Sequence, residues 1–336
     1  MVIENKRLEF LDALKGLAIL LVVAGHWMIR LGISGYENVL WTFIVSLHLP
    51  LFFFVSGYLS EGKSIEINTL VKKAKLLLIP GAIFFTLYMI TRDSSPLSFI
   101  KYGFQEYWFT FVLFEMFFIH FICTHCFKKY GFIGMILCSL FGVVFLTLPE
   151  LRSGQFYIVF CLENLFKYLQ FFTLGILFKK YNTVIFSLLK KDRIKGCLLA
   201  TYIISFFLCF DIYLESQYSI LYRMNHDIIY RYLGVLVILS FFIYKSSFFQ
   251  SRNVVSRSLI FIGQRTLDIY LIHYFLLPTS FLIPESMNNN TMWYVLFLVL
   301  LLLSLAVTGG CILISNLIRM SPSLATFLLG VRKTNI

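Results

Sequence analysis

The residues best suited to chemistry are ionisable side chains inside long apolar stretches. Lys15 and His26 occupy one stretch, at 10–29, and Glu115 occupies another, at 107–127. An ionisable side chain at the centre of a bilayer costs about 2.5–3.5 kcal/mol on scales derived from insertion experiments. Such a side chain must face a protein-lined cavity or another polar group. Each is therefore a candidate for proton transfer or for binding a charged ligand.

Lys15 and His26 share one face of the first stretch. Residues eleven apart on an α-helix differ in direction by only about 20°, and these two are separated by about 16 Å along the axis. Asp12, Ile19 and Val22 lie on the same stripe. A single histidine on an apolar helix is usually a packing residue. A lysine and a histidine aligned on one face favour a functional interpretation.

Two further stretches carry polar groups at similar depth. In 39–60, His48 precedes Pro50, and Ser56 precedes Gly57, which together offer a small surface for a close approach. A kinked, tightly packed helix explains the proline and the glycine but leaves His48 unexplained. In 107–127, Glu115 lies about two turns below Trp108, an aromatic residue suited to the membrane interface.

The stretch 258–281 contains Arg265, Asp268 and His273. Arg265 and Asp268 are three residues apart, so they are either an internal ion pair or, for Arg265, part of a cationic pocket with Lys15. His273 lies about two turns deeper. In 156–178, we expect Glu163, Asn164 and Lys167 to be buried, with a structural pair between Glu163 and Lys167.

These residues fall into two predicted layers. A cytoplasmic layer has cations suited to phosphates, and a deeper layer has groups suited to proton transfer. The first contains Lys15, Arg265, Lys72, Lys73 and Lys75, and the second contains His26, His48, Glu115 and His273. This arrangement suits a protein that takes a phosphorylated donor from the cytoplasm and performs acid–base chemistry within the membrane.

Composition defines the elements that must position these groups. Of 336 residues, 59% are apolar and only 14% are charged, and the mean hydropathy is +0.82. These values exclude a soluble enzyme, a disordered chain and a disulfide-stapled secreted module. The formal net charge of +12 comes from short basic runs between apolar stretches, which argues against a nucleic-acid partner. One straight helix cannot direct Cys123, Cys126 and the nearby histidines at one metal ion, so no metal is expected.

The pattern predicts an all-α polytopic membrane protein with about ten transmembrane helices, forming a single membrane-embedded domain over 1–336. Most of the 29 basic residues lie in alternate loops, which places both termini in the cytoplasm of a plasma (inner) membrane protein. The expected spans are 10–29, 39–60, 75–91, 107–127, 131–148, 156–178, 196–214, 228–245, 258–281 and 292–317.

Four segments resemble the acyltransferase 3 family of membrane O-acyltransferases. Lys15 and His26, within Phe10-Leu11-Asp12-Ala13-Leu14-Lys15-Gly16…His26, resemble the family's R/K-x10-H motif. Phe53-Phe54-Val55-Ser56-Gly57-Tyr58-Leu59 resembles its second span, and Trp108-Phe109 is similar to the start of its fourth. Ile262-Gly263…Thr266-Leu267…Ile269-Tyr270-Leu271-Ile272-His273 resembles a late segment. Lys15 stands where many members have arginine, and Thr266 where serine is commoner.

The resemblance implies transfer of an acyl group, usually acetyl, from cytosolic acyl-CoA to a hydroxyl of a cell-surface glycan or its lipid-linked precursor. His26 would be the general base, because imidazole has a pKa suited to activating a hydroxyl near neutral pH. Glu115 or His48 would orient it. The cations of the cytoplasmic layer would bind the CoA phosphates, and Ser56, Trp108 and His273 would contribute to substrate binding. The expected partners are the lipid bilayer, acyl-CoA and the saccharide acceptor, and an oligomer is compatible with the sequence.

Two alternatives remain from other classes. Buried His, Glu and Lys residues also form the proton relays of transporters, so a proton-coupled or anion transporter is the second hypothesis. It predicts broken helices paired between two halves of the chain, whereas Pro50 is the one clear break near mid-membrane. A flippase or assembly scaffold for a lipid-linked glycan is the third.

Overall fold

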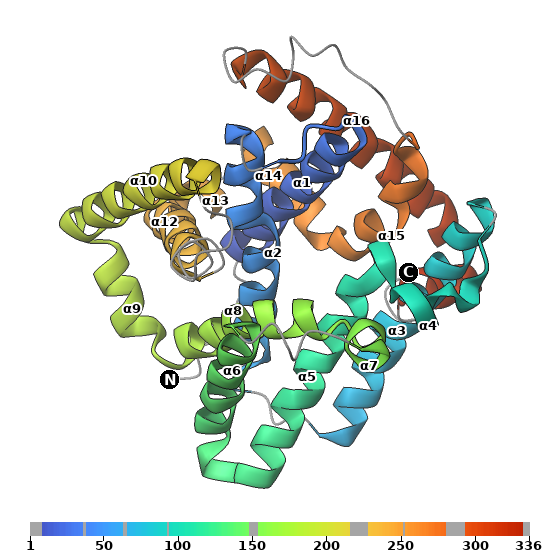
Figure 1. Cartoon of the computed structure of the whole chain (residues 1–336), viewed down its shortest axis with the longest axis horizontal. Helices are drawn as coiled ribbons and strands as arrows, with labels where there is room; N and C mark the ends of the chain where they lie inside the picture. The colour runs from blue at the N-terminus through green and yellow to red at the C-terminus, as the bar shows by residue number, and fades with distance from the viewer. Residues whose placement is uncertain are drawn as a thin grey trace. The chain divides into compact units, whose positions relative to one another are not determined.

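The computed structural model describes residues 9–35, 38–62, 66–92, 94–147, 154–215, 228–250, 253–279 and 293–331. The secondary structure assigned within these ranges is helical, as Figure 1 shows. The chain divides into two compact units, which are described one at a time: 1–55, 181–266 and 277–309 form unit 1, and 56–180, 267–276 and 310–336 form unit 2.

Unit 1 contains the first two long helices and most of the later ones. In this unit α1 packs along α14, and α10 packs beside α12. Its helices are α1 (Glu9–Arg30), the greater part of α2 (Val39–Ser60), α9 (Asn182–Leu189), α10 (Asp192–Glu215), α12 (Tyr230–Tyr244), α13 (Ser246–Gln250), α14 (Val254–Gln264) and the first part of α16 (Trp293–Arg319).

Unit 2 is built around α5, which contacts α3, α6 and α8. It includes the last turn of α2 and the end of α16. Its other helices are α3 (Ile67–Thr91), α4 (Phe99–Tyr102), α5 (Trp108–Phe127), α6 (Gly131–Thr147), α7 (Gln155–Val159), α8 (Leu162–Lys180), α15 (Thr266–Leu276) and α17 (Pro322–Leu329), with short 3-10 turns at Pro96–Ser98, Gln105–Tyr107 and Lys128–Tyr130.

Within the described ranges, five helical segments are long and apolar enough to cross a membrane, and a bent pair of helices, α8 and α9, raises the number to six. Shorter apolar helices accompany them: α6, α12, α14 and α15. The polytopic all-α class therefore agrees with the structure, whereas the count of ten spans stays a prediction. The five segments are Glu9–Arg30, Val39–Ser60, Ile67–Thr91, Gln105–Phe127 and Trp293–Arg319.

The helices differ from three of the predicted spans. The span 258–281 is interrupted at Arg265, which has non-helical backbone angles (φ −117°, ψ 20°) between α14 and α15. The span 156–178 is interrupted between α7 and α8, where Cys161 has a positive φ of 47°. Helix α3 begins at Ile67, eight residues before the predicted start, because lysines at its polar end are good helix formers despite their charge.

Glycines allow the backbones of α1 and α14 to touch. A Cβ atom at Gly263 would overlap the carbonyl oxygen of Asp12 and lie 3.0 Å from the Gly16 nitrogen. A Cβ atom at Gly16 would overlap the carbonyl oxygen of Leu259. In a membrane, where helices gain little from hydrophobic association, small residues drive packing by letting backbones approach closely. These glycines therefore fix α14 against the turn of α1 that carries Lys15.

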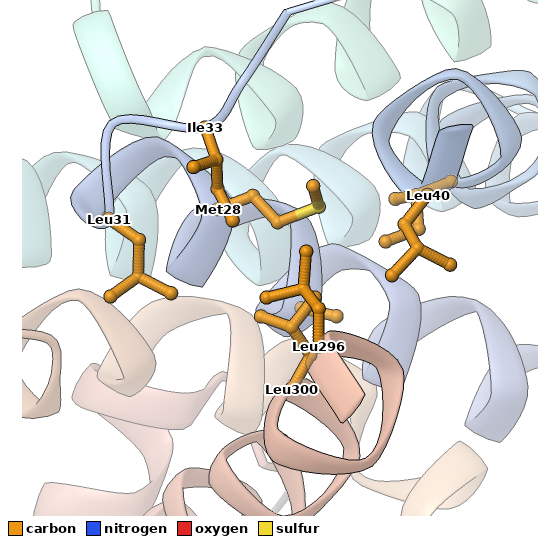
Figure 2. Packing of buried hydrophobic residues seen from close by; sticks show 8 residues of the cluster. Met28, Leu31, Ile33, Leu40, Leu296 and Leu300 are labelled. Carbon is orange, nitrogen blue, oxygen red and sulfur yellow. The ribbon is translucent and has the colours of Figure 1, made fainter. Parts of the chain in front are cut away.

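An aliphatic cluster lies at the C-terminal end of α1 in unit 1. Met28, Leu31 and Ile33 converge with Leu296 and Leu300 of α16, as Figure 2 shows. Leu40 and Ile44 of α2 complete the same cluster. This packing joins the end of α1 that follows His26 to the first turns of α16.

A corresponding contact occurs in unit 2. A Cβ atom at Gly57 would overlap the carbonyl oxygen of Phe172, so the last turn of α2 rests on the backbone of α8. The close approach predicted for Ser56-Gly57 is therefore made by a helix at Gly57.

We predict that Gly263→Ala lowers the thermal unfolding temperature of the purified protein, because the new methyl group collides with backbone that cannot rotate away. Overpacking of this kind typically costs about 1–3 kcal/mol. Gly309→Ala in α16 is the matched control, since nothing lies within 4 Å of its Cβ position. That change should be neutral or slightly stabilising, because alanine is the better helix former. Equal unfolding temperatures for the two variants would contradict the backbone contact.

Candidate functional site

In unit 1, the predicted stripe on α1 faces the protein more than the surroundings. Asp12, Ile19 and Val22 are buried, whereas Lys15 and His26 are partly buried. The Lys15 ammonium lies 2.7 Å from a carboxylate oxygen of Asp12. An ion pair of this kind reduces the cost of placing either charge inside the membrane. The lysine is held by its own helix, and about a fifth of its side chain stays accessible (21%).

Arg265 lies where α14 ends. The side chain of Asn253 caps the start of this helix by accepting a hydrogen bond from the Ser256 amide (2.8 Å). At the other end the Arg265 guanidinium lies 5.1 Å from the centre of the Phe261 ring, within range of a cation–π interaction. Gly263, two residues earlier, touches the α1 backbone next to Lys15. The α1–α14 contact therefore brings the two backbone segments that carry the predicted phosphate-binding cations together.

His48 is partly buried in α2, and its Nδ1 atom lies 2.7 Å from the carbonyl oxygen of Ile44. Because a carbonyl can only accept, Nδ1 carries a proton, and Nε2 is left as the acceptor in the neutral ring. Arg231 of α12 is close enough to interact electrostatically with His48.

Arg231 is 1% exposed and was not among the predicted site residues. The cost of an ionisable side chain in a membrane span would have identified it within 228–245. Its charge lies beside a histidine that we predict to support catalysis.

In unit 2, Trp108 and His273 are joined by a continuous group of aromatic rings. Trp108 stacks on Tyr168 (5.8 Å between ring centres), and its neighbour Phe109 lies 5.2 Å from Tyr270. The Tyr270 ring is 6.0 Å from that of His273. Aromatic pairs at these separations are favourable and stiff. Two of the predicted substrate-binding residues therefore belong to one packed cluster.

Hydrogen bonds hold this cluster in place. His273 is completely buried, and its Nδ1 lies 2.7 Å from the Tyr270 carbonyl oxygen and 3.1 Å from that of Ile269, so this nitrogen carries a proton. The Tyr107 hydroxyl donates to the carbonyl of Leu271 (3.0 Å), and the Tyr270 hydroxyl donates to that of Glu106 (2.9 Å). These two bonds join α15 to the 3-10 turn that precedes α5.

Glu115 is partly buried on α5, seven residues after Trp108. Its Oε2 atom is buried and has no hydrogen-bond partner among the described residues. A buried carboxyl oxygen without a partner is costly, and such groups often have a role in binding or catalysis. The position of Glu115 is compatible with a carboxyl group that receives or holds a proton.

The basic end of α3 presents Lys72 and Lys75 as exposed side chains. Lys73 is partly buried, with its ammonium 3.8 Å from the centre of the Phe117 ring. In the same unit, burial raises the pKa of Glu61, against the opposing effect of the Lys180 charge. A carboxyl group that is more readily protonated neutralises less of the surrounding positive charge. Ser56 is partly buried at the end of α2.

The structure decides between the two interpretations that the sequence left open for Asp268, and it corrects one predicted burial. Asp268 is buried and pairs with Arg319 of α16 (2.7 Å), not with Arg265, and it also accepts a hydrogen bond from Ser315 (2.6 Å). In α8, Glu163 is exposed, and Asn164 and Lys167 are only partly buried, so the expected burial of Glu163 was wrong. Glu163 lies in the first turn of this helix, where a carboxylate is favoured by the helix dipole and reaches water.

No group of three His, Cys, Asp or Glu side chains in the described ranges could hold a metal ion. Cys123 instead lies beside Cys138 of α6, with 4.0 Å between the sulfur atoms.

These positions lie within a region of the chain that matches a known protein family. The family model of the acyltransferase 3 domain, described as an acyltransferase domain, matches residues 8–314. Comparison with curated proteins and with solved structures finds no match. The matched region includes every residue predicted above for the site.

We predict that Asp268→Asn lowers the thermal unfolding temperature, because it removes the charge that compensates Arg319. Losing one partner of a buried or partly buried pair costs about 1–3 kcal/mol. In a double-mutant cycle measured by thermal unfolding, Asp268→Asn and Arg319→Gln should be strongly coupled. The cycle of Asp268→Asn with Arg265→Gln should be additive, and coupling in that second cycle instead would restore the Arg265 pair.

Proposed function

Because the chain belongs to the acyltransferase 3 family and is a membrane acyltransferase, we propose that it transfers an acyl group, acetyl in the simplest case, from cytosolic acyl-CoA. The acceptor is a hydroxyl of a cell-surface glycan or of its lipid-linked precursor. The observation that carries the proposal is the match over residues 8–314, within which Lys15 and His26 share one stripe of α1.

The donor is proposed to bind through its phosphates at the cytoplasmic side. Lys15 and Arg265, on the touching helices α1 and α14, provide two cations in unit 1. Lys72, Lys73 and Lys75 provide a second basic group on α3. A lysine recognises phosphate as a point charge, whereas an arginine adds a planar fork of donors, so Arg265 contributes more directional recognition than Lys15.

His26 is proposed to activate the acceptor. A ring nitrogen removes the hydroxyl proton while the oxygen forms a bond to the thioester carbonyl carbon. The carbon–sulfur bond then breaks, and the imidazolium returns the proton to the departing CoA thiolate, which leaves as the thiol. His48 and Glu115 are the predicted candidates for supporting the charged imidazole. The same residues also allow a covalent acyl-imidazole intermediate.

The acceptor is proposed to enter from the side opposite to the donor. The distribution of lysine and arginine predicts cytoplasmic termini, so the start of α1 faces the donor and its end faces outward. Trp108 is stacked on Tyr168 near the outer end of α5, and aromatic faces of this kind suit the apolar faces of sugars. Ser56 and His273 are the other predicted substrate-binding residues.

One observation favours the transporter as the second candidate. The chain breaks between α14 and α15 at Arg265, and it breaks between α7 and α8 at Cys161. Broken helices form ion and substrate sites in many transporters. Movement of a solute without transfer of an acyl group would support that function.

We predict that membranes containing the protein transfer radiolabel from [acetyl-¹⁴C]acetyl-CoA to a glycan or lipid fraction, and that His26→Ala reduces the rate about 10²- to 10⁴-fold. This is the usual contribution of a general base. His125→Ala is the matched control, because this histidine is exposed at the end of α5 and should leave the rate unchanged. A normal rate in His26→Ala would exclude His26 as the base. Solute flux without labelled product would support the transporter.

We also predict that Lys15→Gln raises the KM for acetyl-CoA about tenfold while kcat changes less, because the lysine binds phosphate in the ground and transition states alike. Lys15→Arg should keep most of the affinity. Steady-state rates over a range of acetyl-CoA concentrations measure both constants. A fall in kcat at unchanged KM would place Lys15 in the chemical step and not in donor binding.

A further inference from the structure

Two buried hydroxyl groups of α16 lack hydrogen bonds within the part of the chain that the structure describes. Ser304 is 1% exposed and Thr308 is 2% exposed. Neither hydroxyl oxygen has a hydrogen-bond partner among the described residues. The two residues are four apart, so their side chains lie one above the other on the same face of the helix, about 6 Å apart along the axis.

Ten other helical hydroxyls among the described residues form a bond that these two lack. A serine or threonine in a helix can bond to the carbonyl three or four residues earlier. This bond satisfies the hydroxyls of Ser46, Ser60, Thr91, Thr110, Thr124, Ser139, Ser187, Thr201, Ser240 and Thr326. Ser304 and Thr308 do not form it. Since an unpaired buried hydroxyl is destabilising, the pair points to a polar partner that binds there.

The position of this pair relates it to the candidate site in unit 1. Leu296 and Leu300 of α16 pack in the same cluster as Met28 of α1 (Figure 2). Ser304 and Thr308 follow Leu300 by about 6 and 12 Å along the axis. By the predicted topology α16 runs from the outer side inward, opposite to α1. The same displacements along α1 from Met28 reach the depth of residues 24 and 20, so by this topology the two hydroxyls lie at a depth between those of Lys15 and His26.

We propose that Ser304 and Thr308 bind the amide groups of the pantetheine arm of acyl-CoA. The inference rests on the proposed function, because that arm must extend from the phosphates near Lys15 to the thioester near His26. A hydroxyl donates to an amide carbonyl and accepts from an amide N–H, so two hydroxyls one turn apart form two successive contacts. A saccharide acceptor that enters from the outer side reaches His26 before it reaches these hydroxyls.

The test compares CoA with 3′,5′-ADP, which carries phosphates but lacks the pantetheine arm. The double variant Ser304→Ala/Thr308→Val should bind CoA about 5- to 100-fold more weakly by titration calorimetry, as expected for two lost hydrogen bonds. Its affinity for 3′,5′-ADP should equal that of the wild type. Its thermal unfolding temperature without ligand should stay the same or rise, because no hydrogen bond is removed and two unpaired polar groups are replaced.

Ser139→Ala is the matched control. The Ser139 hydroxyl is buried and satisfied by Thr173 Oγ1 (2.7 Å) and the Met135 carbonyl (2.9 Å), so its loss should lower the unfolding temperature and leave CoA affinity unchanged. The proposal is overturned if the double variant binds CoA as tightly as the wild type does, or unfolds as early as Ser139→Ala. A wild-type protein that binds neither CoA nor 3′,5′-ADP would instead overturn the proposed function, and the inference with it.

Discussion

The backbone contact between α1 and α14 is the constraint on which unit 1 depends. Gly16 and Gly263 each face the backbone of the other helix, which leaves no room for a side-chain carbon. Because this contact is between main chains, its geometry does not depend on a choice of rotamers. It therefore holds the turn that carries Lys15 at a fixed distance from the end of α14, where Arg265 begins the next segment. The backbones that carry these two cationic side chains are thus rigidly placed, which would lower the entropy cost of binding a ligand between them.

Two basic side chains of these helices form ion pairs with aspartates. Asp12 neutralises Lys15 within one turn, and Asp268 neutralises Arg319 across two helices. The two pairs differ in whether they leave hydrogen-bond donors for a ligand. The Lys15 ammonium directs one of its three N–H donors at Asp12, so its other donors can bind an anion. Asp268 is buried and also bonded to Ser315, which makes it a structural link between α15 and α16. The first pair suits binding, and the second suits stability.

Sequence reasoning succeeded where the signal is local and periodic. The bounds of α1, α2 and α16 match the predicted spans within a few residues, since long apolar runs bounded by polar residues define a helix of spanning length. It failed at Arg265, because an interruption between two apolar helices leaves the hydropathy pattern almost unchanged. It left the partner of Asp268 open, because that partner, Arg319, is 51 residues away. A local charge pattern offers the neighbour three residues along the chain as one candidate, and only the fold decides between the candidates.

The residues of the candidate site also differ in whether the sequence could predict them. The stripe on α1 could be predicted because helical spacing alone fixes which residues share a face. Arg231 could have been identified from its charge inside a predicted span. Ser304 and Thr308 could not, because their importance lies in burial and in missing hydrogen bonds among the described residues. The three glycines of the family-like segments, Gly16, Gly57 and Gly263, each lie against the backbone of another helix. The resemblance therefore describes how the helices pack as well as what chemistry they support. In a chain with these segments, the glycines let the helix backbones come together. The packed helices then determine where their polar side chains lie.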